Sequence, residues 1–162
     1  MSTPMPNKLC VLAIDPGYDR LGVAVMEGAT LLFSECYTPP KGALAERLAA
    51  VYARVEALIR EYAPNAVAVE TLFFTKNQKT AIAVAEARGV IVLAAARSGI
   101  PLFEYSPQDV KIAVTGSGAA SKAGVIKMVP KIVALPLRER KDDEYDAIAL
   151  ALAHQSRSRI PK

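Results

Sequence analysis

Two apolar runs, each ended by a single acidic residue, constrain the fold of this chain more than any other feature. Residues 9–14 (LCVLAI) are followed at once by Asp15, and residues 66–69 (AVAV) are followed by Glu70. Between them, residues 44–62 carry apolar side chains at helical spacing, which predicts an amphipathic crossover helix. A strand that follows such a helix usually lies parallel to an earlier strand and is buried on both faces. We therefore expect two neighbouring parallel strands whose acids meet at one edge of the sheet.

The remaining apolar segments complete a layered α/β pattern. Residues 21–26 and 30–37 follow the first run closely, which predicts an antiparallel meander of three strands. We further expect a helix over 77–97, a strand over 101–105, and helices that begin at Ser106, at Ser121 and at about Asp143. This order resembles the ribonuclease-H-like architecture, an α/β fold with a mixed central sheet of about five strands flanked by helices. One domain is expected over 1–162, with flexible tails at 1–8 and 156–162.

Composition narrows the classes of function. The 162 residues carry a formal charge of +4 and a sequence pI near 9.1, which fits an anionic partner such as nucleic acid. No apolar run approaches the roughly 18 residues of a membrane span, and the polar start lacks a secretory signal, so we expect a cytoplasmic protein. Cys10 and Cys36 lie in apolar segments without a CxxC pattern and are expected to be buried thiols. The single histidine, His154, excludes a His-ligated zinc hydrolase.

The last predicted helix adds further acids. Asp143 and Asp146 share a helix face, and the AIALALA segment that follows Asp146 is too apolar for a surface helix. Asp142, four residues before Asp146, is an alternative to Asp143, and all acids at 142–144 could instead complement the helix dipole. Two carboxylates about 5 Å apart repel by roughly 3 kcal/mol, so a cluster needs a divalent cation or protonated members. Oxygen ligands select Mg²⁺ or Mn²⁺, and two such ions form the clamp used in phosphodiester hydrolysis.

A series of motifs, in order over residues 9–155, resembles the RuvC family of bacterial Holliday-junction resolvases. The motifs are IDPG at 14–17 with GV at 22–23, VE at 69–70 with Phe73, ARG at 87–89, VK at 110–111, and DxxDA at 143–147 with His154. The resemblance implies an endodeoxyribonuclease that nicks two opposed strands of a four-way DNA junction in recombination and repair. It also implies two Mg²⁺ or Mn²⁺ ions per active site, a homodimer, and cooperation with the branch-migration motor proteins RuvA and RuvB.

The same resemblance suggests roles for individual residues. It implies that the metal-binding and catalytic acids are Asp15, Glu70, Asp143 and Asp146, and that Lys111 and Lys122 assist activity by contacting phosphate. The candidate nucleic-acid-binding residues are Phe73, Phe74, Lys76, Asn77, Lys111, Ser117 and Lys122. Phe73 matches an aromatic residue that contacts junction bases, whereas Phe74 could instead belong to the core. Between Asp143 and Asp146 the chain departs from the family, because Glu144 and Tyr145 stand where small residues are common.

Two other functions are compatible with the same fold. A YqgF-type nuclease acting on RNA precursors shares the first acidic strand and the closing helix, but it usually lacks the middle acid and the Phe-bearing loop. Glu70 and Phe73 therefore argue against it. A non-catalytic nucleic-acid-binding domain would be expected to have lost one of the four acids, and all four are present.

Overall fold

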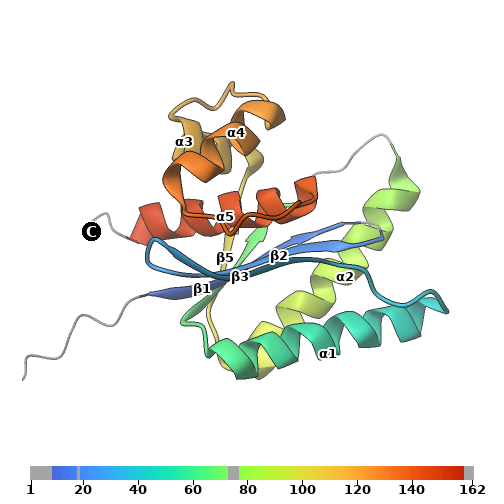
Figure 1. Cartoon of the computed structure of the whole chain (residues 1–162). Coiled ribbons are helices and arrows are strands. Elements are labelled where there is room, and N and C mark those ends of the chain that lie inside the picture. Colours follow the sequence, from blue (N-terminus) through green and yellow to red (C-terminus); the bar gives the residue numbers. More distant parts are fainter. Residues whose placement is uncertain (1–8, 18, 73–76, 159–162) are drawn as a thin grey trace, which may run out of the picture.

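The computed structural model describes residues 9–17, 19–72 and 77–158. In this part of the chain, five strands form one mixed sheet in the order β3-β2-β1-β4-β5 (Figure 1). The strands are β1 (Cys10–Pro16), β2 (Leu21–Glu27), β3 (Thr30–Tyr37), β4 (Ala66–Glu70) and β5 (Leu102–Tyr105). The pairs β1–β2 and β2–β3 are antiparallel. The pairs β1–β4 and β4–β5 are parallel. The mixed five-stranded sheet predicted from the sequence is confirmed.

Helices cover both faces of the sheet. The described helices are α1 (Leu44–Tyr62), α2 (Gln78–Arg97), α3 (Pro107–Thr115), α4 (Lys122–Ile132) and α5 (Asp142–Ser158). Figure 1 shows α1 and α2 on one face, and α5 on the other with α3 and α4 stacked above it. Among the described residues, no helix combines the length and the apolar character needed to cross a membrane.

Two hydrophobic clusters hold these layers together, one on each side of the sheet. Along β1, Leu12 and Ile14 pack with α1 and α2, whereas Val11 and Ala13 pack with α5. All four side chains are fully buried, which explains why the central strand is a continuous apolar run without alternation. The small residues of α5 lie against the sheet, and this close packing places the start of the helix at the strand ends.

The structure departs from the sequence-based expectations at a few boundaries. α5 continues to Ser158, so residues 156–158 are helical although they were expected in a flexible tail. The hydroxyls of Ser156 and Ser158 donate to carbonyls of the preceding turn, which extends the hydrogen bonding of the helix end.

The expectation that both cysteines are buried is confirmed for Cys10 and wrong for Cys36. Cys10 is buried, but Cys36 is half-buried because β3 is an edge strand.

Candidate active site

The two acids that follow the apolar runs meet at one edge of the sheet. Ile14 of β1 is the register partner of Val69 of β4, so the next residue on each parallel strand, Asp15 and Glu70, comes at the same end. Both acids line one pocket, together with residues from the start of α2 and with Pro107. The carboxyl edge of a parallel strand pair is where open α/β sheets place their ligands.

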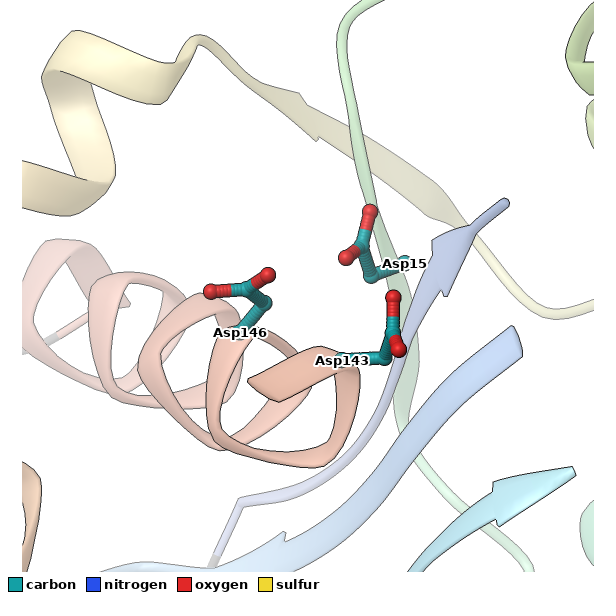
Figure 2. Close-up of side chains that lie close together, drawn as sticks. All are labelled: Asp15, Asp143 and Asp146. Carbon is teal, nitrogen blue, oxygen red and sulfur yellow. The ribbon is translucent and has the colours of Figure 1, made fainter. Parts of the chain in front are cut away.

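The first turns of α5 bring two more carboxylates to this edge. One carboxylate oxygen from each of Asp15, Asp143 and Asp146 lies within 4.8 Å of the other two. Figure 2 shows the three side chains facing one another, with Asp15 at the end of its strand and the other two on the helix. Within the described residues this group contains Asp143, whereas Asp142 is exposed on the same turn. Three oxygen donors at this spacing suit a divalent cation.

Glu70 lies at the side of this group. It lines a second pocket with Lys111, Lys122 and Asp146. Asp15, Asp143 and Asp146 are called the three-acid group below. Glu70 lines pockets with members of this group and with the two lysines.

A glycine allows α5 to approach the sheet this closely. Gly22 on β2 is the register partner of Asp15 on β1. A Cβ atom added at Gly22 would lie 1.8 Å from the backbone oxygen of Asp143. The first turn of α5 thus rests on bare backbone of β2, directly beside the strand that carries Asp15. The sequence motif contains this glycine, but the sequence alone does not show what it contacts.

Burial and mutual repulsion shift the titration of these acids. Burial, followed by the nearby carboxylates of Glu70, Asp146 and Asp143, raises the pKa of Asp15 to about 8. Burial and Asp146 also raise the pKa of Glu70. Burial raises the pKa of Asp146, and the opposing effect of the Lys122 ammonium only reduces this shift. The acids are therefore costly to ionise together in the absence of a further cation, as expected of a cation-binding site.

Among the described residues, two basic side chains contact the three-acid group. Lys122 Nζ lies 3.0 Å from Oδ2 of Asp146, and Arg20 Nε lies 2.5 Å from Oδ2 of Asp143. Both basic side chains are about half exposed, so either can turn towards solvent or an anionic ligand. Lys122 was predicted from the sequence, whereas Arg20 was not. No sequence signal points to Arg20, because it lies in a turn far from Asp143 along the chain.

Of the other candidate nucleic-acid-binding residues, Asn77 and Ser117 lie in the described part of the chain. Phe73, Phe74 and Lys76 belong to the residues that the structure does not describe. The Asn77 side chain accepts a hydrogen bond from the backbone N–H of Thr80 and caps α2. Ser117 is exposed in the connection between α3 and α4, where its hydroxyl accepts a hydrogen bond from the Ala119 N–H.

Comparison with known proteins gives a consistent family match. The family model described as "Crossover junction endodeoxyribonuclease RuvC" matches residues 11–154. A protein of that name from Moorella thermoacetica is 45% identical over 91% of this chain and 92% of its own length. Another, from Brachyspira hyodysenteriae, is 42% identical over 94% of this chain and 97% of its own.

Solved structures agree with the sequence relatives. A Thermus thermophilus RuvC in complex with a Holliday junction substrate superposes with a TM-score of 0.85 at 37% identity, covering 93% of this chain and 95% of that one. The yeast mitochondrial Holliday junction resolvase Ydc2 reaches a TM-score of 0.69 at 11% identity, over 94% of this chain and 80% of its own, which shows a shared fold.

Proposed function

This chain belongs to the RuvC family of crossover junction endodeoxyribonucleases, and from that premise we propose that it resolves four-way DNA junctions by nicking two opposed strands. The reaction is hydrolysis of a phosphodiester bond in recombination and repair. The observation that carries the proposal is the meeting of Asp15, Asp143 and Asp146 within 4.8 Å at the carboxyl edge of the sheet.

The cofactor that fits this site is Mg²⁺ or Mn²⁺, with two ions per active site. The donors are all carboxylate oxygens, which these hard cations prefer, and burial together with the neighbouring carboxylates raises the pKa of Asp15 to about 8. Asp15, Asp143 and Asp146 would hold the metal, and Glu70 completes the set from the adjacent strand. When bound, such ions activate a water molecule and stabilise the leaving oxygen.

Basic side chains around the acids bind the DNA backbone in this proposal. Lys111 and Lys122 line one pocket with Glu70 and Asp146, where an ammonium group can contact a phosphate beside the scissile bond. Phe73, with Phe74 and Lys76 beside it, is proposed to stack on junction bases, and Asn77 and Ser117 to contact the strands nearby.

A homodimer supplies the two active sites that paired nicks require. α2 supports this proposal, because Ile82 and Leu93 are 58% and 51% exposed on it. They stand about three helical turns apart, on one face. Exposed large apolar side chains on one helix face fit a contact with a second copy. The protein is proposed to work in the cytoplasm as a single domain over 1–162, with the branch-migration proteins RuvA and RuvB.

The proposed function is tested by comparing synthetic four-way junctions, duplex DNA and structured RNA as substrates with and without Mg²⁺. We expect Mg²⁺-dependent cleavage of the junction in preference to both other substrates. Asp15→Asn and Glu70→Gln should abolish cleavage and leave junction binding largely intact, because binding depends on basic residues. The matched control is Asp19→Asn, since Asp19 lies in the same hairpin, is 65% exposed and pairs only with Arg47 among its described contacts. Preferred cleavage of RNA, or undiminished cleavage by either mutant, would overturn the proposal.

A further inference from the structure

Glu144, a buried acid outside the three-acid group, lies between Asp143 and Asp146 in the sequence. Glu144 is 3% exposed, although it sits in the first turn of α5, beside Asp143. One residue along a helix turns the side chain by about 100°, so Glu144 points away from the three-acid group and towards β3. There the Ser34 hydroxyl donates to Glu144 Oε1 at 2.6 Å.

Two arginines complete the surroundings of this carboxylate. Arg138 donates to both oxygens of Glu144, in one case at 3.2 Å and in the other through a short contact. The buried Nε of Arg140 lies 3.4 Å from Oε1 of Glu144. Glu144, Arg138, Arg140 and Ser34 are called the Glu144 cluster below.

The Glu144 cluster ties the segment before α5 to the edge of the sheet. Arg138 also donates to the Ser34 backbone oxygen at 3.0 Å, and Arg140 donates to the Pro136 carbonyl at 2.9 Å. A buried charge of this kind is tolerated only when it is paired and hydrogen-bonded. The contacts of Glu144 therefore favour this position of the first turn of α5 relative to β3.

This position is fixed from two sides. On one side Glu144 is bound to Ser34 of β3, and on the other the Asp143 carbonyl rests on Gly22 of β2. Asp143 carries one of these anchors and is next to the other in the sequence, and its carboxylate faces Asp15.

We propose that Glu144 is a positioning residue for the cation site: through Arg138 and Ser34 it holds the first turn of α5 where Asp143 and Asp146 meet Asp15. The inference rests on the metal site of the proposed function. Residues that orient metal-binding side chains typically change metal affinity by about 10–100-fold when replaced. The Glu144 cluster thus sets cation affinity without contacting the cation.

The test is calorimetric titration of the metal-free, full-length protein with Mn²⁺ in the absence of DNA, alongside melting of the same samples. Glu144→Gln keeps the shape of the side chain and removes the charge, and we expect it to weaken Mn²⁺ binding about tenfold. Arg138→Lys keeps the charge and loses the planar fork, and we expect a smaller loss. The control is Glu139→Gln, because the Glu139 side chain is exposed and only its backbone oxygen is hydrogen-bonded among the described contacts.

The outcomes separate this inference from the function on which it rests. Weaker Mn²⁺ binding in both variants, with Glu139→Gln equal to wild type, supports a positioning role. A lower melting temperature with unchanged Mn²⁺ affinity in both variants would show a purely structural role and overturn it. If Glu144→Gln does not fold, Arg138→Lys decides by the same criterion. A wild-type protein that binds no Mn²⁺ would overturn the metal site itself.

Discussion

Replacing Gly22 with alanine should separate Asp15 on β1 from Asp143 and Asp146 on α5 in the proposed metal site. The new Cβ atom would lie 1.8 Å from the Asp143 oxygen, whereas ordinary van der Waals contact begins at 3.4 Å. The start of α5 therefore has to move by about 1.6 Å, which carries Asp143 and Asp146 away from Asp15. A misplacement of about 1 Å in a catalytic site can cost about 100-fold in rate. We expect at least that loss in Mg²⁺-dependent cleavage of a four-way junction.

The same substitution should lower stability. Overpacking costs about 1–3 kcal/mol, which corresponds to a fall in Tm of about 3–10 °C for a domain of this size. Gly28→Ala is the control, because it adds the same methyl group in the turn that follows the same strand, with nothing within 4 Å. Its positive φ makes alanine cost about 1 kcal/mol, but it does not move α5, so cleavage should stay at the wild-type level. A Gly22→Ala protein that cleaves like the control would refute the close seating of α5 on β2.

Four further results are expected. Mg²⁺ should raise Tm by relieving carboxylate repulsion, and no change at saturating metal would contradict this. Because the folded-state pKa of Asp15 is raised from 3.8 to about 8, the metal-free folded protein binds more protons than the unfolded chain in that window. Its free energy of unfolding should therefore fall as the pH rises from about 4 to about 8, and Asp15→Asn should flatten the Tm profile measured in EDTA. Lys122→Ala removes the cation that competes for Asp146, so it should enlarge the Mg²⁺-induced rise in Tm while lowering cleavage, and an unchanged rise would argue against competition. Leu93→Asp should convert a dimer to a monomer in sedimentation, whereas a dimer that persists would place the interface elsewhere.

Patterns local in the sequence predicted most of the fold. The continuous apolar runs identified β1 and β4 as central strands, and the crossover helix between them predicted their parallel pairing. Because parallel strands end at the same edge, the approach of Asp15 to Glu70 followed from these local patterns. Helical spacing likewise placed Asp143 and Asp146 on one face, although it could not decide between Asp142 and Asp143.

Contacts between distant segments could not be predicted in this way. Arg20 binds Asp143 across 123 positions of the chain, and Ser34 binds Glu144 across 110. The acids at 142–144 looked alike in the sequence as candidates for the helix dipole. Only the packing of α5 on the sheet distinguishes the buried Glu144 from the exposed Asp142 and from Asp143, which lies close to Asp15 and Asp146.

The most direct test of the proposed cation site is an anomalous difference map from crystals soaked in Mn²⁺. Convergence of the acids predicts a strong peak between the carboxylates of Asp15, Asp143 and Asp146, with Glu70 beside it. Asp15→Asn crystals should show a weaker peak or none. Saturating Mn²⁺ that gives no peak at these residues, or a peak elsewhere on the molecule, would contradict a cation-holding active site at the edge of the sheet.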